Sequence, residues 1–337
     1  MQPKPRVVVD PHFWSMDRLF SPADRERLEQ TVDVVWGRDE PMPVEEAIPE
    51  LETAEAIVCT SWRYGEVGEN FPDLRAIIDV SGGFPTALDY EACFTRGIHV
   101  LSAAPGFARQ VAEMSLGLAL ACSRGIVSAD RAMRAGTEQW LGAGNRDSFL
   151  LYGKPVGFLG FGSIAQALQP LLAPFGCRIS AHDPWLGDGY LRRCGVEPVD
   201  LETLVSGSRV LFVLAAPSVE NRALLSREVL ERIQPGAVLV LISRAHVVDF
   251  DALTDLVSDG RFRAAIDVFP AEPPPLDHPI RRAEGAVLSP HRAGSVPEGF
   301  WELGELVVDD LEMLARGLPP RRLQPAAREV VRRLVHP

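Results

Sequence analysis

Short apolar runs alternate with amphipathic stretches over most of the 337-residue chain. A short run that is apolar throughout is typical of a strand buried on both faces, as in a parallel sheet. An amphipathic stretch is typical of a helix that covers one face of such a sheet. The pattern therefore predicts an α/β fold of doubly wound sheets with helices on both faces.

The apolar runs form two series, and each series predicts one α/β unit. The length of the chain is sufficient for two cores. Strands of the first unit are expected at residues 6–10, 32–36, 56–60, 74–80 and 99–102. Strands of the second unit are expected at residues 155–159, 178–181, 210–214, 237–242, 264–266 and 286–288.

Two longer helical patterns, at residues 108–124 and 296–316, predict helices that connect the two units. We therefore predict a first domain at 1–103 and a second domain at 104–291. The remaining segment, 292–337, is expected to bridge back to the first domain.

Charge and composition limit the possible partners. The sequence has 34 Lys and Arg against 46 Asp and Glu, a formal net charge of -12 at pH 7. Such a chain has no basic footprint, so we expect neither nucleic acid nor a membrane surface as a partner, and a small molecule instead. The sequence runs directly into a strand without an apolar signal region, and no uncharged apolar stretch reaches membrane-spanning length, which predicts a cytoplasmic protein.

Five cysteines are scattered along the chain without Cys-x-x-Cys spacing. We therefore expect buried, reduced thiols, with neither a disulfide framework nor a metal site. The five are Cys59, Cys93, Cys122, Cys177 and Cys194.

A strand-turn-helix signal with three small residues lies in mid-chain. Gly160 permits a tight turn out of the strand, Gly162 lets a pyrophosphate approach the backbone, and Ala165 lets the helix pack closely on the strand. The phosphates would lie at the helix N-terminus, where unpaired N–H groups and the helix dipole favour negative charge. We therefore expect Gly160, Gly162, Ser163 and Ile164 to bind a dinucleotide.

An acidic residue, Asp183, directly follows the next apolar strand. Its carboxylate can accept hydrogen bonds from ribose hydroxyls and would repel a 2′-phosphate, which favours NAD over NADP. The glycine turn and Asp183 together predict a Rossmann domain that binds NAD.

Three polar residues follow three different strands of the second unit: Arg244, Glu272 and His291. Ligands of open α/β sheets bind outside the carboxyl ends of the strands, so we expect these side chains near the nicotinamide. Together they would form a hydride-transfer site. The guanidinium of Arg244 would bind a carboxylate, the imidazole of His291 would move a proton, and the carboxylate of Glu272 would orient the imidazole.

The segments around these three residues, together with the glycine turn, resemble the D-isomer-specific 2-hydroxyacid dehydrogenases over nearly the whole chain. Residues 243–249 look like the family's arginine segment, 267–273 like its glutamate segment and 289–295 like its histidine segment. Further matches lie at Val111-Ala112-Glu113 and at Gly136 with Trp140.

The resemblance implies a role for each residue. Arg244 would bind the substrate carboxylate and carbonyl, His291 would be the acid/base, Glu272 would be its partner, and Asp267 would help hold the nicotinamide. The resemblance also implies a homodimer built through the cofactor domains. With a Rossmann NAD-binding domain in the second unit, we expect a flavodoxin-like substrate domain in the first.

The resemblance assigns a further role to the loop after the strand at 74–80. Backbone N–H groups of Ser81, Gly82 and Gly83 are expected to bind the substrate carboxylate, because paired glycines allow close approach. This loop is about one residue longer than the family's usual pattern.

Other positions also depart from the family. Leu241 stands where the family usually has asparagine, and Ala245 where it usually has glycine, so we expect a different shape for the turn that carries Arg244. Arg292, beside His291, is unusual and would add a second cation for a dianionic substrate. A solvent-facing arginine is at least as good an interpretation.

We expect an enzyme that interconverts a small 2-hydroxy acid and its 2-oxo acid with NAD as cofactor. The alternative within the enzymes is a dehydrogenase of a phosphonate-bearing or other dianionic alcohol. The alternative from another class is a non-catalytic NAD-sensing binding protein, against which the complete set of Arg244, Glu272 and His291 argues.

Overall fold

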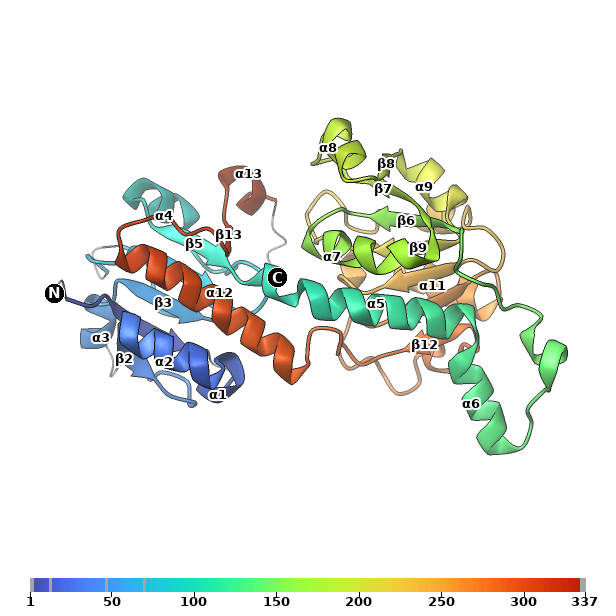
Figure 1. Ribbon diagram of the computed structural model, residues 1–337, viewed down its shortest axis with the longest axis horizontal. Coiled ribbons are helices and arrows are strands. Elements are labelled where there is room, and N and C mark those ends of the chain that lie inside the picture. Colours follow the sequence, from blue (N-terminus) through green and yellow to red (C-terminus); the bar gives the residue numbers. More distant parts are fainter. Residues whose placement is uncertain (1–2, 12–13, 46–47, 69–70, 334–337) are drawn as a thin grey trace. The chain divides into compact units, whose positions relative to one another are not determined.

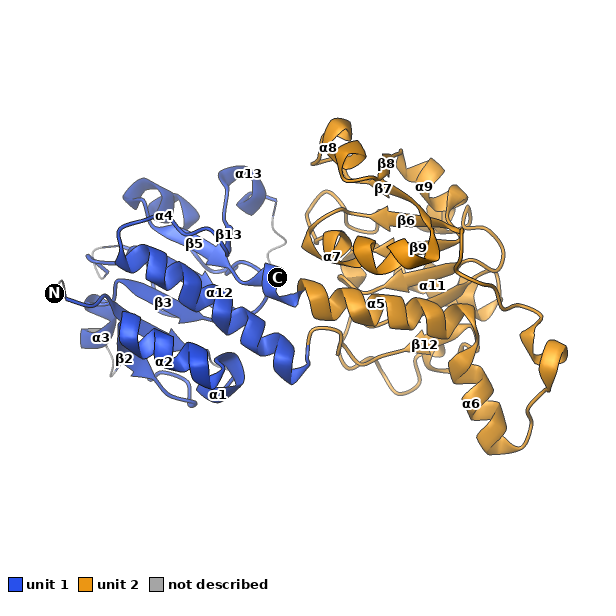
Figure 2. Cartoon of the chain, in the orientation of Figure 1, with its two compact units in different colours: residues 1–107, 295–337 blue, residues 108–294 orange. Residues whose placement is uncertain are grey.

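The protein is described by a computed structural model, which divides into two compact units (Figure 2). Met1–Phe107 and Ser295–Pro337 form unit 1, and Ala108–Gly294 forms unit 2. The chain passes between the units a few residues later than positions 103 and 291, where the sequence predicted the boundaries. The residues that the structure describes are 3–11, 14–45, 48–68 and 71–333.

Unit 1 contains a six-stranded sheet in the order β13-β5-β4-β3-β1-β2 (Figure 1). The strands β1 to β5 pair in parallel, and β13 pairs antiparallel with β5. The chain goes from β1 to β2 on one side and then continues with β3 on the other, which is a doubly wound plan. The bounds are β1 Arg6–Asp10, β2 Asp33–Gly37, β3 Ala56–Cys59, β4 Ala76–Asp79, β5 His99–Ser102 and β13 Gln324–Pro325.

Alternate residues of the unit 1 strands enter two different cores. Val7 and Val9 pack with α1, α2 and α12, whereas Val8 packs with α3, α4 and α13 on the other face. Successive side chains of a strand point to opposite faces, so a strand that is apolar at every position needs cover on both. The helix bounds are α1 Met16–Leu19, α2 Pro22–Thr31, α3 Ile48–Glu52, α4 Tyr90–Arg96, α12 Pro297–Ala315 and α13 Arg328–Val331.

Unit 2 contains a seven-stranded parallel sheet in the order β12-β11-β10-β9-β6-β7-β8. The strand order reverses between β6 and β9, which is the switch point at which such sheets bind ligands. The bounds are β6 Pro155–Leu159, β7 Arg178–His182, β8 Glu197–Pro198, β9 Val210–Val213, β10 Val238–Leu241, β11 Arg263–Ile266 and β12 Ala286–Leu288.

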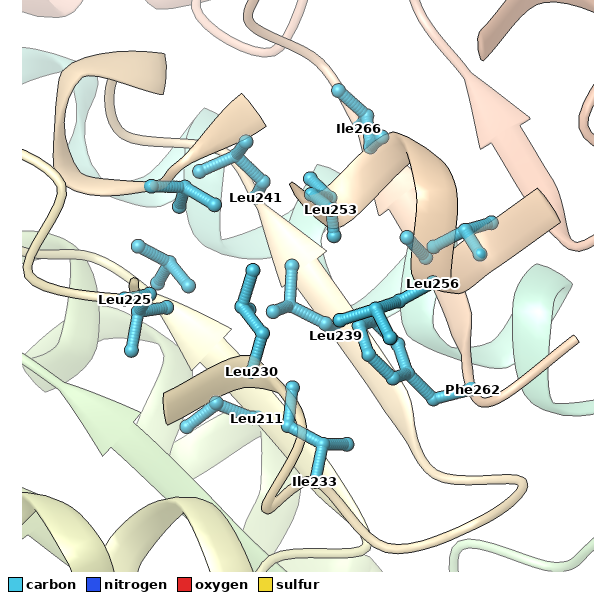
Figure 3. Close-up of a cluster of buried hydrophobic side chains, with 14 of the residues drawn as sticks. Leu211, Leu225, Leu230, Ile233, Leu239, Leu241, Leu253, Leu256, Phe262 and Ile266 are labelled. Atoms are coloured by element: carbon cyan, nitrogen blue, oxygen red, sulfur yellow. The ribbon is translucent and has the colours of Figure 1, made fainter. Parts of the chain in front are cut away.

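Helices cover both faces of the unit 2 sheet. One face carries α5 and α7, and α5 also packs against β10 and β11. The other face carries α9, α10 and α11, where Leu239 and Leu241 pack with Leu230 and Leu253 in one fully buried cluster (Figure 3). Burial of each leucine side chain contributes roughly 2 kcal/mol. The bounds are α5 Ala108–Ser123, α7 Ser163–Leu172, α8 Asp188–Arg193, α9 Leu201–Gly207, α10 Arg227–Leu230 and α11 Phe250–Ser258.

The predicted doubly wound α/β fold is confirmed, and every predicted strand is present within two residues at each end. The two connecting helical patterns correspond to α5 and α12. The strands β8 and β13 were not predicted, because a two-residue edge strand has no apolar run to mark it. All five cysteines are free, but only three are buried. Cys177 and Cys194 are partly exposed, because they lie toward the β8 edge of the sheet.

A part of unit 2 extends away from its sheet: α6 (Ile126–Ala135) and the loop that follows it (Figure 1). The helix has no buried residue. Among the described residues, no single helix is long and apolar enough to cross a membrane. Residues 104–123 and 126–135 meet the criteria of length and composition only when taken together, across a bend of 57°.

Candidate functional site

The glycine turn after β6 leaves no room for a side chain at its first position. Gly160 has a φ of +91°, which favours glycine, and a Cβ there would lie 2.7 Å from Cα of Ala215. Ala215 follows β9, the neighbour of β6 across the switch point. The turn therefore depends on glycine for both its conformation and its packing.

The N-terminus of α7 is open. Gly162 is the N-cap residue, and no side chain caps the helix. A Cβ at Gly162 would meet nothing within 4 Å, both Gly162 and Ser163 are exposed, and Ile164 is half-buried. Free N–H groups at a helix N-terminus attract phosphate, so these residues fit the pyrophosphate of a dinucleotide.

Asp183 lies directly after β7 and contacts the glycine turn. Its Oδ2 accepts a hydrogen bond from Phe161 N–H at 2.8 Å, and its Oδ1 accepts one from Trp185 N–H at 2.9 Å. Each carboxylate oxygen has a further lone pair, which suits the hydroxyls of a ribose. The structure thus brings the two parts of the predicted NAD site together.

The buried carboxylate of Asp267 holds the turn after β12. Oδ1 accepts hydrogen bonds from the Ser289 hydroxyl and from Arg292 N–H at 3.0 Å, and Oδ2 accepts one from Ala293 N–H at 3.1 Å. Inside this turn, His291 has a φ of +49°, and its N–H donates to the carbonyl oxygen of Asp267 at 2.8 Å. The left-handed backbone conformation is uncommon for histidine, and these hydrogen bonds hold His291 in it.

Glu272 and His291 contact each other. His291 Nδ1 lies 2.6 Å from Glu272 Oε2, while Glu272 Oε1 accepts a hydrogen bond from Phe269 N–H at 2.9 Å. Both side chains are partly exposed, and no partner of His291 Nε2 is found within the described ranges. The glutamate fixes the ring at one nitrogen and leaves the other available to a ligand.

Arg244 follows β10 and has an exposed side chain. Its Nη1 donates to the carbonyl oxygen of Ser243 at 2.7 Å. The buried Oγ of Ser243 has no partner among the residues that the structure describes. The strands β10, β11 and β12 are neighbours, so Arg244, Asp267 and His291 follow adjacent strands at one edge of the sheet.

In unit 1, the predicted substrate loop follows β4 and contacts a buried carboxylate. Oδ1 of Asp79 accepts hydrogen bonds from Ser81 N–H at 2.7 Å and from the Ser81 hydroxyl at 2.5 Å. Gly82 has a φ of +94°, and a Cβ there would lie 2.9 Å from the ring of Phe107. A Cβ at Gly83 would meet nothing within 4 Å. The two glycines therefore differ: Gly82 is required by the fold, and Gly83 is not.

Asp79 titrates unusually for a carboxylic acid. Burial raises its pKa from 3.8 to about 6, and the hydrogen bonds from Ser81 and from Gly83 N–H partly offset this rise. One of the N–H groups that were expected to bind a substrate carboxylate, that of Ser81, therefore already donates to a carboxylate of the protein.

A cavity of about 830 Å³ lies elsewhere in unit 1, beside β2 and α2. None of the predicted site residues lines it. Function is better assigned to the carboxyl ends of the sheets, where the titratable side chains lie. Within the described part of the chain, no group of three or more His, Cys, Asp and Glu could hold a metal ion.

Comparison with known proteins decides the family. Residues 116–293 match the family model described as D-isomer specific 2-hydroxyacid dehydrogenase, NAD binding domain. The chain belongs to the D-isomer specific 2-hydroxyacid dehydrogenase family. It is therefore an NAD-dependent 2-hydroxyacid dehydrogenase, and the predictions of the family, the enzyme class and the cofactor are confirmed.

Three relatives illustrate the similarity. A glyoxylate reductase of Korarchaeum cryptofilum is 30% identical over 94% of this chain and 95% of its own length. A D-3-phosphoglycerate dehydrogenase of Archaeoglobus fulgidus is 31% identical over 83% of this chain, which spans only about half (53%) of that relative. The solved structure of a phosphoglycerate oxidoreductase from Rhizobium etli is 38% identical, with a TM-score of 0.86, and the match covers 97% of this chain and 100% of that one.

Family membership does not assign the individual residues. The roles of Arg244, Glu272 and His291 stay predictions, as do the cofactor contacts of Asp267 and of the glycine turn. Asp79 has no predicted role, although only Val80 separates it from Ser81 of the substrate loop. A buried acid at the end of an apolar strand was the available signal.

The two glycines of the substrate loop provide a matched pair of variants for this dehydrogenase. Gly83→Val should keep the thermal stability and raise KM for the oxo acid roughly tenfold, because a side chain would obstruct a charge-assisted hydrogen bond to the substrate. Gly82→Val should lose about 2 kcal/mol or more of stability, because it combines a strained φ with a clash against Phe107. Thermal unfolding and KM are measured for both variants. The affinity for NADH is measured as well, to show that the cofactor site is unchanged. An unchanged KM in Gly83→Val would remove the loop from the site.

Proposed function

We propose that this protein reduces a small 2-oxo acid to the D-2-hydroxy acid with NADH, and catalyses the reverse oxidation. The contact between Glu272 and His291, on a turn held by buried Asp267, is the observation that carries the proposal. A partly exposed imidazole that is oriented by a carboxylate is suited to general acid/base chemistry.

The cofactor would bind at the switch point of unit 2. Gly160, Gly162, Ser163 and Ile164 would hold the pyrophosphate, and Asp183 would accept hydrogen bonds from the ribose hydroxyls. Asp267 would contribute to the nicotinamide end. When bound, NADH supplies the hydride that reduces the carbonyl carbon.

The substrate would be oriented by its carboxylate. Arg244 offers a planar fork of donors for the carboxylate and the neighbouring carbonyl oxygen. In unit 1, the N–H groups of Ser81, Gly82 and Gly83 would provide donors for a substrate carboxylate. The open space beside Gly83 supports this assignment.

His291 would move the proton. In reduction, the protonated imidazole donates from Nε2 to the oxygen of the developing alkoxide, and in oxidation the neutral ring takes the proton back. The carboxylate of Glu272 stabilises the positive ring and holds Nδ1, so that Nε2 faces the substrate.

The names of the relatives indicate candidate substrates, glyoxylate and 3-phosphoglycerate, for those proteins. For this chain we propose a small 2-oxo acid. A phosphonate-bearing or other dianionic substrate is the second candidate, since the side chain of Arg292 is exposed directly beside His291. NADH consumption across a panel of 2-oxo acids, including dicarboxylates and phosphonates, tests both. A protein that binds NADH and consumes it with no member of the panel would contradict the proposal.

We also propose that the protein is a homodimer formed through unit 2. Ile126, Met133, Trp140 and Leu141 are each more than half exposed on α6 and the loop that follows it. Several large apolar side chains exposed on one segment are typical of a protein interface, and a two-fold axis would bring this segment of two copies together. Light scattering of the intact protein should give twice the mass of the chain. The cytoplasmic location stays a prediction.

Asp183 is expected to determine the choice of cofactor. Asp183→Ala should lower the affinity for NADH and raise the affinity for NADPH, each roughly tenfold. The variant loses an acceptor for the ribose hydroxyls and a charge that repels the 2′-phosphate. Asp183→Asn keeps an acceptor for Phe161 N–H and separates the effect of charge from that of the turn. Titrations followed by cofactor fluorescence measure both affinities. If the unmodified protein binds NADPH as tightly as NADH, Asp183 does not select the cofactor.

Glu272 is expected to act through His291. Glu272→Gln should lower kcat by at least about tenfold with little change in NADH affinity, because an amide cannot balance the charge of the ring, and His291→Gln should cost a hundredfold or more. Glu284→Gln is the matched control, since Glu284 is an exposed acid of the same unit. Steady-state kinetics decide the matter, and a Glu272→Gln variant with the kcat of the wild type would exclude Glu272 as the partner.

A further inference from the structure

The substrate loop contains an anion of its own. Asp79 ends β4 with only 1% of its surface exposed, and its Oδ1 lies 2.7 Å from Ser81 N. The Ser81 hydroxyl also donates to this carboxylate. These are donors of the segment that we propose as the binding site for the carboxylate of the substrate.

Two carboxylates cannot use the same donors equally well. An N–H that donates to Asp79 is not free for a second acceptor, and a second negative charge close to the first is disfavoured in a buried site. A neutral Asp79 is a weaker acceptor and exerts no charge repulsion. Substrate binding is therefore favoured when Asp79 carries a proton.

The surroundings of Asp79 do not neutralise its charge. Cys59 faces it from β3 and Tyr90 interacts with it from α4, and burial raises the pKa of both groups, so that they stay neutral at pH 7. On the other side, β5 contributes Ser102. The next acid along the sheet edge, Asp10, is paired with Arg63. Within the described ranges, no cation forms an ion pair with Asp79.

We propose that Asp79 is an internal competitor of the substrate, and that a 2-oxo acid binds to the loop in the form of the enzyme in which Asp79 is protonated. Asp79 is thus a specificity-determining residue that disfavours anionic substrates at neutral pH. The inference rests on the proposed function of the loop.

The size of the effect follows from the fraction of protonated Asp79. With a pKa of about 6, about one tenth of the molecules carry the proton at pH 7, and most carry it at pH 5. If only this form binds the substrate, KM at pH 7 is raised about tenfold over that of the protonated form. At pH 5, one unit below this pKa, the difference has nearly disappeared.

Asp79→Asn is the direct test, because asparagine keeps the shape and one acceptor oxygen without the charge. We expect KM for a monoanionic 2-oxo acid to fall about tenfold at pH 7 and to be nearly unchanged at pH 5. The ratio of the two KM values at each pH removes every pH effect that the two proteins share. A neutral ester of the same oxo acid should show no such gain.

A second measurement does not depend on turnover. Oxamate, an unreactive analogue of a 2-oxo acid, should bind to the complex of enzyme and NADH with uptake of protons at pH 7. The uptake should be smaller in Asp79→Asn by up to about one proton. Calorimetry in two buffers of different ionisation enthalpy gives this number.

Asp89→Asn is the matched control. Asp89 is an exposed acid of the same loop that caps α4 through Ala92 N–H, and asparagine caps a helix equally well. Its KM should equal that of the wild type at every pH.

The opposite role for Asp79 is that of a brace that shapes the loop. In that case Asp79→Asn would raise KM for the acid and the ester alike, and this result, or an unchanged KM, would overturn the proposal. Such a failure is distinct from failure of the proposed function, in which the wild type itself would not consume NADH with any oxo acid.

Discussion

The buried carboxylate of Asp267 is the interaction on which the candidate site depends. It accepts hydrogen bonds from three donors in the turn after β12. The backbone carbonyl oxygen of Asp267 accepts a fourth hydrogen bond, from His291 N–H. A buried charge is stable only when such bonds satisfy it, so the turn and the carboxylate each require the other. This turn places His291 in contact with Glu272. Glu272 in its turn accepts a hydrogen bond from Phe269 N–H in the segment after β11.

The parallel sheets explain why such acids lie where they do. The central strands β4 and β11 are buried on both faces, so the end of such a strand is the first position at which a polar side chain can meet the loops. Asp79 ends the central strand β4 in unit 1, and Asp267 follows the central strand β11 in unit 2. Both carboxylates accept hydrogen bonds from a loop at the end of the sheet. They differ in consequence, because Asp267 holds the turn that carries His291, whereas Asp79 accepts hydrogen bonds from the loop that we propose as a binding site for the substrate carboxylate.

Much of this arrangement could be predicted from the sequence, because long apolar runs report burial and glycines report special backbone conformations. Gly160 and Asp183 were predicted as parts of one site, and the structure brings them together through Phe161 N–H. The missing elements lack such local signals: β8 and β13 contain two residues each, and α6 packs none of its side chains into the core. The bonds of Asp79 depend on the direction of a side chain in the folded loop, which no periodicity encodes.

The reaction that we propose for this site is transfer of a hydride to the carbonyl carbon of a 2-oxo acid, with a proton from His291 completing the alcohol. The most direct measurement is the reduction, in ordinary water, of a 2-oxo acid that the enzyme accepts, with NADH that carries two deuterium atoms at C4. Chiral analysis and mass spectrometry then identify the product. We expect a D-2-hydroxy acid with one deuterium on C2 and an ordinary, exchangeable hydroxyl proton. An L-product, or a product without deuterium on C2, would contradict it.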